Sequence, residues 1–545
     1  MENNENEILE EKKDVPVNPA PTSTIENKPK KKKNSALAII LILVLLCAAG
    51  VGGYLFFFSK PTEPTTIGND TKDVKSEYRM SGNSLENFDL AFLKLENEAK
   101  NKVYSPLSIK YALEMLAEGA DGESKAQLDA IIGDYVAKKY TNSEHMSFAN
   151  AMFVKENFKE AVKEEYTNTL KTKYNAEIIF DTFESAKNVN DWVNNKTFKL
   201  INNLLDDDTV SISDFFIVNA LAIDMNWKNK IQSSVSEVPG DIGSMYYRVE
   251  YIHENYFDYI SAIENDEYPT ITFNNKENTK SVIVGASLNR YDIVKDLGED
   301  NIRKTITEDF TKYLKDNPSE VNHCPAVEEY VNQYITDINK NYKKEDISTD
   351  YYISDTDEVK VFAKDLQTYD GLSLQYVGIM PKTTNLDTFI KDADNKKISK
   401  IISEMKEVKL ENFKDGVVTQ IKGNIPLFKF DYDLQLLDDL KKLGVNDIFN
   451  PSDADLTNMI ENKGEFINTA VHKATIEFSN DGIKAAAATT IGGLGAAHDC
   501  FYDYKYDVPV EKIDITFDKP YMFIIRDKDS GEVWFTGTVY EPIKK

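Results

Sequence analysis

The sequence predicts an α+β domain, because helical patterns fill its first part and strand patterns fill its last third. Apolar residues recur at helical spacing from Phe88 to Leu95 and again from Tyr111 to Leu116. Towards the C-terminus, apolar and polar residues instead alternate in short runs that are typical of strands. These runs lie at residues 423–430, 471–478, 512–517, 521–526 and 532–539.

The composition limits the partners that this chain can have. Of its 545 residues, 41% are hydrophobic and 28% are charged, so most of the chain can bury a core. Its formal net charge of −27 argues against nucleic acid as a partner, since phosphate binding needs clustered lysine and arginine. We therefore expect a solvated acidic surface.

The motifs of common enzymes are missing from the sequence. It has no Gly-x-Ser-x-Gly elbow, no His-Glu-x-x-His and no Gly-Lys-[Ser/Thr] phosphate loop. Five histidines offer little general-base chemistry. Ser105, which precedes Pro106, is typical of a helix N-cap rather than a nucleophile. We expect no enzyme, no cofactor and no small-molecule substrate.

Three cysteines set no disulfide framework. Cys47 lies in an apolar run, so only Cys324 and Cys500 could pair in the folded part, and the sequence leaves that bridge open. Neither His323-Cys324 nor His498-Asp499-Cys500 has the repeated ligand spacing of a zinc site, so we expect no metal.

The N-terminal part predicts a membrane anchor. Residues 36–58 are 23 residues without a charge, enough to cross a hydrocarbon core of about 30 Å. They follow the basic run 28–33, which predicts a cytoplasmic N-terminus and an extracellular domain. Residues 1–35 then form a disordered cytoplasmic tail, and residues 59–84 an extracellular linker. A cleaved signal peptide is the alternative, although the run is longer than a usual signal core.

A change of composition at about residues 245–348 predicts a module inserted into the folded domain. Tyr, Asn, Lys and Glu are frequent there, with helix-like residues 307–314 and 326–341 and strand-like residues 281–285. We assign no chemistry to this module.

The most informative segment lies between Asn480 and Ala497. Four alanines and two threonines, residues 485–490, are followed by a Gly/Ala stretch at 491–497, and residues 471–478 before them are strand-like. Small side chains leave water at little cost and clash with nothing on entering a sheet. This composition indicates a segment that is an exposed loop at one time and a strand at another.

This arrangement resembles the hinge and reactive-centre loop of serpins, and further stretches are similar to the family in the same order. They are residues 101–109, 118–124, 190–197, 216–228, 425–456, 517–526 and 535–539. The resemblance covers residues 85–545 apart from the insertion. It implies helices packed on a large central mixed β-sheet, with additional antiparallel sheets and an exposed reactive-centre loop.

The resemblance also implies a function, inhibition of serine-type endopeptidases by a suicide-substrate mechanism. The protease cuts the loop, is held as an acyl-enzyme and is trapped when the loop enters the central sheet. The implied partner is a serine protease captured covalently, or alternatively a cysteine protease.

Individual residues take their implied roles from the same resemblance. The hinge comprises Gly482, Ile483, Lys484, Ala485, Ala486, Ala487, Ala488 and Thr489. The family's spacing from Gly482 places the reactive bond at Ala496–Ala497, within a range that includes Leu494, Gly495 and His498. An alanine at the specificity position implies an elastase-like or subtilisin-like target, whereas Leu494 would imply a larger apolar pocket.

Five more residues are implied to control the conformational change. Ser105, Ser108, Asn219 and His472 fall where the sheet must part, and Trp227 falls where the loop first enters. Ordinary core packing is the alternative for His472 and Trp227.

Two features depart from the family pattern. The loop is longer than the family's, with extra residues near 498–509 that include several aromatic side chains, and the 245–348 insertion is large. A non-inhibitory cell-surface binding or adhesion module is therefore the alternative function. Four consecutive hinge alanines favour inhibition, because a loop that never inserts has no need of them.

Overall fold

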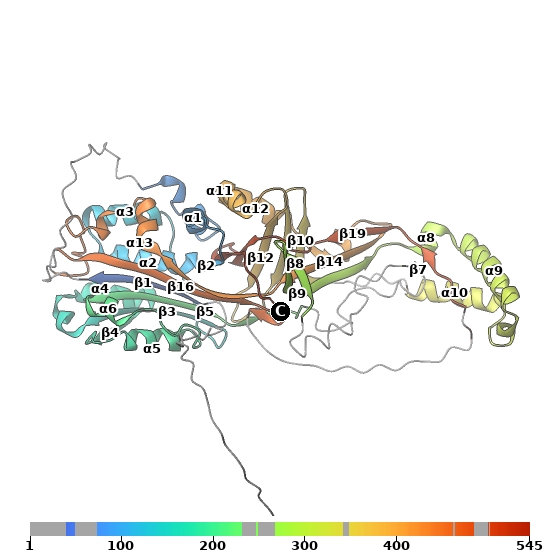
Figure 1. Cartoon of the computed structure of the whole chain (residues 1–545), viewed down its shortest axis with the longest axis horizontal. Helices are drawn as coiled ribbons and strands as arrows, with labels where there is room; N and C mark the ends of the chain where they lie inside the picture. Colours follow the sequence, from blue (N-terminus) through green and yellow to red (C-terminus); the bar gives the residue numbers. More distant parts are fainter. Residues whose placement is uncertain are drawn as a thin grey trace, which may run out of the picture. The chain divides into compact units, whose positions relative to one another are not determined.

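The structure is a computed structural model that describes residues 40–48, 74–231, 247–248, 268–341, 348–461, 464–483, 500 and 502–544. Within these residues, three sheets of four or more strands are combined with helices (Figure 1). The predicted α+β class, with helices packed on a large mixed sheet and additional sheets, is confirmed.

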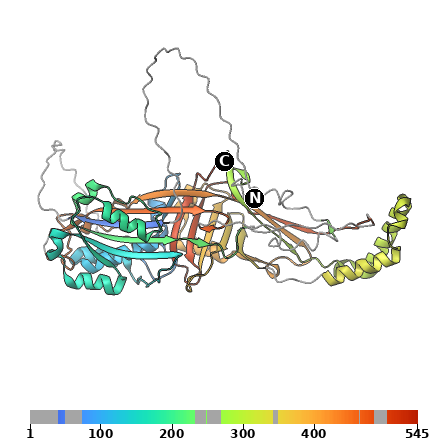
Figure 2. The ribbon, with the colours of Figure 1, turned by 90° about the horizontal axis from the view of Figure 1, so that it is seen from below.

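The central sheet has six strands in the described part of the chain. Their spatial order is β15 (Phe428–Gln435), β16 (Phe466–Phe478), β1 (Ile40–Ala48), β5 (Phe215–Ile223), β3 (Met146–Lys155) and β4 (Glu177–Asp181). β1 is antiparallel to both β16 and β5, so these two flanking strands run parallel to each other. Figure 2 shows β1, in blue, within this sheet.

Both faces of the central sheet are covered by helices. Ile217 and Leu221 of β5 belong to the main apolar cluster together with helix α2 (Pro106–Gly119). The alternate residues Val218 and Ala220 belong to a second cluster with α5 (Lys187–Lys196). Successive strand residues point to opposite faces, and β5 is apolar apart from Asn219 because neither face meets water.

A second sheet completes the main core. Its order is β13 (Lys406–Lys409), β10 (Ser348–Asp355), β11 (Val359–Asp365), β12 (Leu374–Pro381), β20 (Tyr521–Asp527), β21 (Val533–Val539) and β2 (Lys102–Tyr104). The remaining helices of the body are α1 (Asn87–Leu95), α3 (Gly122–Ile132), α4 (Glu164–Tyr174), α6 (Asp207–Ser211), α11 (Leu386–Asp392), α12 (Asn395–Ser403) and α13 (Leu436–Lys442). Short 3-10 helices are at Ser76–Tyr78, Glu156–Ala161, Pro318–Asn322, Leu410–Asn412 and Asp447–Phe449.

The region expected as one inserted module, 245–348, is divided between two parts of the structure. β8 (Thr270–Phe273) and β9 (Lys276–Asn289) form a four-stranded sheet with β14 (Val418–Pro426) and β19 (Val510–Asp514). Alternate apolar residues of β9 are buried in the main core, and this strand therefore cannot stand apart from it.

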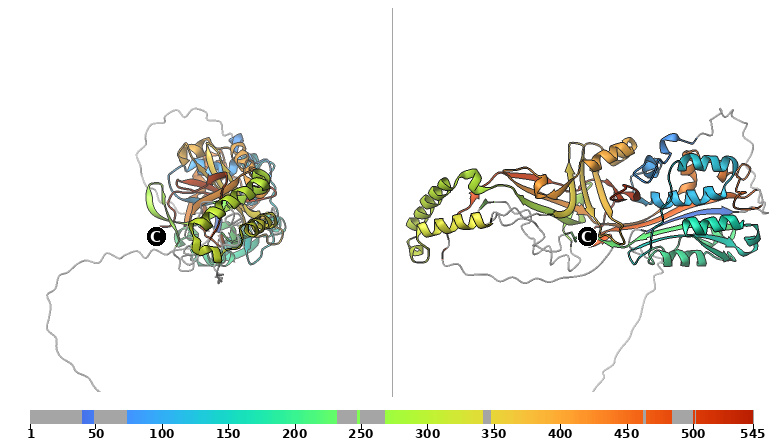
Figure 3. Two further views of the ribbon diagram at one scale, coloured as in Figure 1. Left: turned by 90° about the vertical axis from the view of Figure 1, so that its right-hand side faces the viewer. Right: turned by 180° about the vertical axis from the view of Figure 1, so that it is seen from behind.

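The rest of that region is helical. Helices α8 (Ile293–Leu297), α9 (Glu299–Asp316) and α10 (Val327–Asn341) build a separate apolar cluster, in which α9 and α10 lie side by side (Figure 3).

Residues 74–84, expected in an extracellular linker, are folded against the body instead. Met80 is fully buried, and its N–H donates to the carbonyl of Ile131 at 3.0 Å. Tyr78 is also buried. The linker prediction is wrong for these residues, because two large apolar side chains within a polar stretch are enough to anchor it.

The expected membrane helix at 36–58 differs from the structure where the two can be compared. Ile40–Ala48 form strand β1, which has a hydrogen-bonded neighbour on each side. An uncharged run containing three isoleucines and two valines suits a central strand as well as a bilayer. No helix among the described residues combines the length and the apolarity needed to cross a membrane. Residues 1–39 and 49–73 lie outside the described residues, and the anchor stays a prediction.

Candidate functional site

The first two hinge residues are held at the end of the central sheet. After β16 the chain turns at Ser479, whose N–H donates to the carbonyl of Gly482 at 3.2 Å. β17 (Gly482–Ile483) then pairs antiparallel with β6 (Met225–Asn226), which follows β5. A Cβ on Gly482 would lie 2.5 Å from the Met225 carbonyl oxygen. Only glycine allows this approach of the two backbones.

The remaining predicted loop residues cannot be compared with the structure. Lys484, Ala485, Ala486, Ala487, Ala488, Thr489, Leu494, Gly495, Ala496, Ala497 and His498 lie outside the described residues. Ile483, by contrast, is fully buried in the main core. Asp481 just before it forms an ion pair with Lys230 at 2.6 Å. The hinge therefore begins from a fixed point.

Trp227 lies against the turn where the chain leaves β16. Its backbone N–H donates to the carbonyl of Asp481 at 3.0 Å, and its indole Nε1 donates to the carbonyl of Ser479 at 2.9 Å. Its ring packs on Phe478 and Tyr376, with centroids 5.4 Å and 6.1 Å away. The structure thus brings Trp227 next to Gly482 and Ile483, and its role in loop entry stays a prediction.

Ser105, Ser108 and His472 meet at the start of α2. Ser105 is the N-cap of this helix, and its Oγ accepts from the Ser108 N–H at 3.0 Å. The Ser105 N–H donates to Nε2 of His472 at 3.1 Å. All three side chains are fully buried. The predicted gate residues therefore lie together beneath the central sheet, on the side that α2 covers.

Asn219, the fourth predicted gate residue, is on the other side of β1. Leu43 of β1 pairs with Asn219 on one side and with His472 on the other. Asn219 donates from Nδ2 to Oδ1 of Asn150 at 2.6 Å, and Asn150 donates to the carbonyl of Tyr174 at 2.8 Å. Sequence analysis did not find Asn150 or Tyr174, because nothing in their local sequence marks this contact.

Three buried polar atoms of the predicted gate residues lack a hydrogen-bond partner among the described residues: Nδ1 of His472, Oδ1 of Asn219 and Oγ of Ser108. Burial lowers the pKa of His472 well below its usual value, so the imidazole is neutral. Since Nε2 accepts from Ser105, the ring proton is on Nδ1. The Nδ1–H of His472 on β16 and Oδ1 of Asn219 on β5 are thus a donor and an acceptor without partners, one on each strand that flanks β1.

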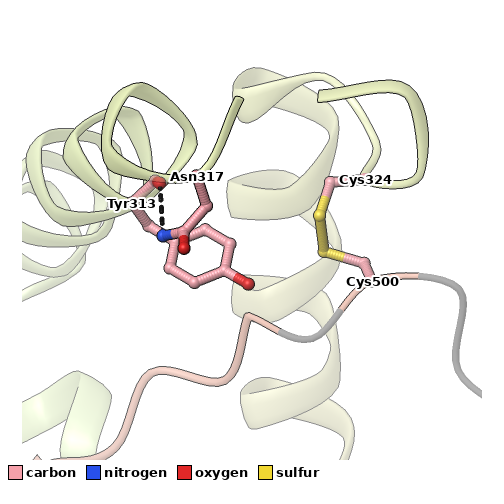
Figure 4. Close-up of a disulfide and its surroundings, with 4 residues drawn as sticks. All are labelled: Tyr313, Asn317, Cys324 and Cys500. Carbon is pink, nitrogen blue, oxygen red and sulfur yellow. Dashed lines mark hydrogen bonds between the residues drawn. A yellow bond between two sulfur atoms is a disulfide. The ribbon is translucent and has the colours of Figure 1, made fainter. Parts of the chain in front are cut away.

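A feature left open by the sequence is also formed. Cys324 and Cys500, 176 residues apart in sequence, are joined by a disulfide (Figure 4). The bridge links the segment that follows the predicted reactive-centre loop to the segment between α9 and α10. The insertion and the longer loop, the two departures from the family pattern, are therefore joined.

The chain is similar in sequence to known proteins. A family model described as Serpin (serine protease inhibitor) matches residues 86–237 and 344–542. Mouse neuroserpin is 24% identical over 466 residues, covering 82% of this chain and 87% of that protein. Human leukocyte elastase inhibitor is 37% identical over a shorter stretch of 123 residues, 23% of this chain and 30% of that protein.

Solved structures show the same fold. Native tengpin, a thermophilic serpin, superposes with a TM-score of 0.53 at 18% identity, covering 89% of this chain and 97% of tengpin. Uncleaved ovalbumin superposes with a TM-score of 0.52 at 14% identity, covering 85% of this chain and 100% of ovalbumin. At these identities the likeness concerns the fold alone.

Proposed function

This chain belongs to the serpin family, and from that premise we propose that it inhibits serine proteases as a suicide substrate. The serine of the protease attacks the exposed loop and forms an acyl-enzyme, while the new amino terminus leaves. The cut loop then enters the central sheet as a strand and carries the protease with it. Distortion of the protease active site prevents water from releasing the acyl group. Serpins are known to insert their cut loop into a sheet, which adds a strand to the sheet and releases stored strain.

The observation that carries this proposal is the register of the hinge. Ile483 pairs with Met225. If this antiparallel pairing continued, each later loop residue would lie opposite the residue one position earlier in β6 and then in β5. In an antiparallel ladder this count brings Ala486 opposite Ala222. Ala222 is the residue with which Ile40, the first residue of β1, pairs in the structure.

The opposite edge of the gap gives the same answer. The turn places Ser479 opposite Gly482, so that continuing the count along β16 brings Ala486 opposite Thr475. Thr475 is the other partner of Ile40. Two independent registers thus lead the hinge into the gap that β1 fills, in the same chain direction as β1. The sheet has room for one strand here, and the loop is connected to its entrance.

On the same count, Thr489 of an inserted loop would lie at the gate. It would be between Asn219 and His472, where Leu43 of β1 is in the structure. There the Thr489 hydroxyl can donate to Oδ1 of Asn219 and accept from the Nδ1–H of His472. Both of those atoms are buried without a partner among the described residues. An entering loop would therefore satisfy polar groups that the apolar strand leaves unpaired.

Energy considerations support trapping. A strand between two partners gains a hydrogen bond for nearly every backbone donor and acceptor, each worth about 1 kcal/mol net. Each tenfold slowing of deacylation requires about 1.4 kcal/mol. Insertion of eight residues, the length of the register shared by β1 and β5, into a gap that β1 has left would therefore release several times the free energy that a tenfold slowing requires.

The small side chain of Ala496, the predicted specificity residue, favours an elastase-like or subtilisin-like target. Leu494 would instead select a protease with a larger apolar pocket. Neither arginine nor lysine occurs between residues 485 and 500, which argues against a trypsin-like target.

Incubation with a panel of serine proteases tests the proposal. We expect an adduct with an elastase-like enzyme that survives SDS, together with a new amino terminus at Ala497. A protease in which the catalytic serine is replaced by alanine is the matched control and should give no adduct. Cleavage of the loop without any adduct, and with the protease still fully active, would contradict inhibition.

The location of the protein is a further part of the proposal. We propose that residues 36–58 cross the membrane and that the serpin domain is extracellular. The same residues cannot lie in a bilayer and form β1, so membrane insertion would empty the gap that the loop needs. Protease-protection and carbonate-extraction experiments on cells expressing the full chain test this. Release of the intact chain by carbonate would contradict the anchor.

One observation favours the alternative, a non-inhibitory cell-surface binding module. In the structure β1 already fills the gap, and a sheet that stays filled would not accept the loop. The melting temperature before and after nicking the loop separates the two functions. Inhibition predicts a large rise after nicking, because a strand is added to the sheet. An unchanged melting temperature would favour the binding module.

A further inference from the structure

The residues that follow the reactive loop are packed into a small module of their own. We define the disulfide-linked module as helices α8, α9 and α10 with residue 500 and residues 502–508. The Cys324–Cys500 bridge joins its two sequence segments, next to Tyr313 and Asn317 at the end of α9 (Figure 4).

Tyr502 is the centre of this packing. Its ring stacks on Phe310 of α9 with centroids 4.3 Å apart, and it also contacts Tyr313 and Tyr330. Its hydroxyl donates to the Asp309 carboxylate at 2.9 Å. Only 9% of Tyr502 is exposed. Burial and the neighbouring carboxylate both raise the pKa of this phenol, so it is a neutral donor.

The backbone beyond Tyr502 is bound as well. The Tyr334 hydroxyl donates to the carbonyl of Tyr504 at 3.1 Å. β18 (Tyr506–Asp507) pairs in parallel with β7 (Tyr247–Arg248), and the ring of Tyr506 is buried. The carbonyl of Pro509 then accepts from the Val418 N–H. Residues 502–509 therefore do not offer the free extended stretch that a protease cleft needs.

These tyrosines are the residues that a protease with a hydrophobic specificity slot would select. A cut at Tyr502 lies six residues beyond Ala496, and a cut at Tyr504 or Tyr506 lies further still. The gap between β5 and β16 accepts a strand of fixed length. A protease attached beyond that length would not be drawn fully along the sheet, and it would be released.

We propose that the disulfide-linked module shields Tyr502, Tyr504 and Tyr506 from proteases and so confines cleavage to the segment before Cys500. The value of this shielding rests on the proposed inhibitory function, but the shielding itself does not. Tyr502, Asp309 and the cystine act here as positioning groups, because they hold the chain and do not touch the reacting atoms. The insertion and the lengthened loop thus act together to restrict where a protease can cut the chain.

The test is digestion of the full chain by chymotrypsin, with the cut sites read by mass spectrometry. In the wild type we expect no early cleavage after Tyr502 or Tyr504. In the double variant Cys324→Ser with Cys500→Ser, cleavage at these bonds should be at least about 100-fold faster, since the rate follows the population of the opened segment. Cys47→Ser, which leaves the bridge intact, is the matched control and should behave as the wild type.

A second variant distinguishes local opening of the module from general unfolding of the chain. Phe310→Ala removes the stacking partner of Tyr502 and keeps every tyrosine, and it should also expose the two bonds. Hydrogen exchange at residues 502–507 should rise in both variants, while exchange in β12 and β20 should not. Equal cleavage after Tyr502 in wild type and double variant would overturn the proposal.

The test of shielding and the test of the proposed inhibitory function have different readouts. Adduct formation with an elastase-like protease tests inhibition, and chymotryptic cleavage sites test shielding. If inhibition holds, the double variant should form as much adduct with the elastase-like enzyme but should be consumed by chymotrypsin as a substrate. Adduct formation by the wild type together with rapid cleavage at Tyr504 would overturn shielding and leave inhibition standing.

Discussion

If the chain inhibits proteases as proposed, replacing Thr489 by arginine should convert it from an inhibitor into a substrate. On the register that continues from Ile483, the side chain at 489 would lie between Asn219 and His472. Both of these residues are fully buried, and neither carries a negative charge. Neither of the two flanking residues would give an arginine at this position an anionic partner.

The magnitude follows from the cost of burying an unpaired charge. That cost is several kcal/mol after relaxation, and we take about 3 kcal/mol for a side chain that can partly reach water. With about 1.4 kcal/mol per tenfold, insertion slows by about 100-fold if position 489 enters the sheet before the rate-limiting step. Deacylation then competes with insertion, and most encounters end in release of the protease.

The assay is the stoichiometry of inhibition, the number of inhibitor molecules consumed per protease molecule inactivated. We expect a value near one for the wild type and a value above about ten for Thr489→Arg. Thr489→Ser keeps the hydroxyl and should stay near one. His498→Arg adds the same charge beyond the predicted reactive bond, where it never enters the sheet, and should also stay near one. A wild-type stoichiometry for Thr489→Arg would refute the register.

Three further predictions concern the residues that hold the hinge, gate and core. Burial depresses the pKa of His472 in the folded state, so the neutral imidazole contributes its full stabilisation above about pH 6.5. This stabilisation is lost at about 1.4 kcal/mol per pH unit as the pH falls below that value. His472→Gln should therefore flatten the dependence of the melting temperature on pH between about 7.5 and 5. Gly482→Ala would force its Cβ against the Met225 carbonyl and should lower the free energy of unfolding by about 1–3 kcal/mol, measured by chemical denaturation. Gly464→Ala would place a Cβ with no atom within 4 Å, so it reports the cost of backbone strain at positive φ without such a contact. Lys110→Met leaves the fully buried Asp89 carboxylate unpaired and should cost about 3–5 kcal/mol, of which most should return in a variant that also carries Asp89→Leu.

The local features of the functional region could be predicted from the sequence. The order of Ser105 and Pro106 predicts the start of α2, because a hydroxyl caps the helix and proline suits its first turn. Gly482 and the small residues after it predict a hinge, since their conformational freedom and size are properties of the residues themselves. The helices and most strands follow from apolar periodicity in the same way.

The contacts between distant residues could not be predicted in this way. Ser105 and His472 are 367 residues apart, and the sequence suggested their meeting only through family resemblance. The partners of Asn219, the bridge between Cys324 and Cys500, and the pairing of β9 with β14 depend on how separate elements pack. Each side chain is compatible with many neighbours, and only the folded chain selects one.

Residues 40–48 show most clearly where the sequence stops being decisive. Their apolar character determined that they would leave water, which is equally satisfied by a bilayer and by a sheet. Only the tertiary structure supplied two parallel edges, β5 and β16, separated by the width of one strand. The sequence determined which segments can move into a sheet; the tertiary structure decided where the gap is, because a gap is made by elements that are far apart along the chain.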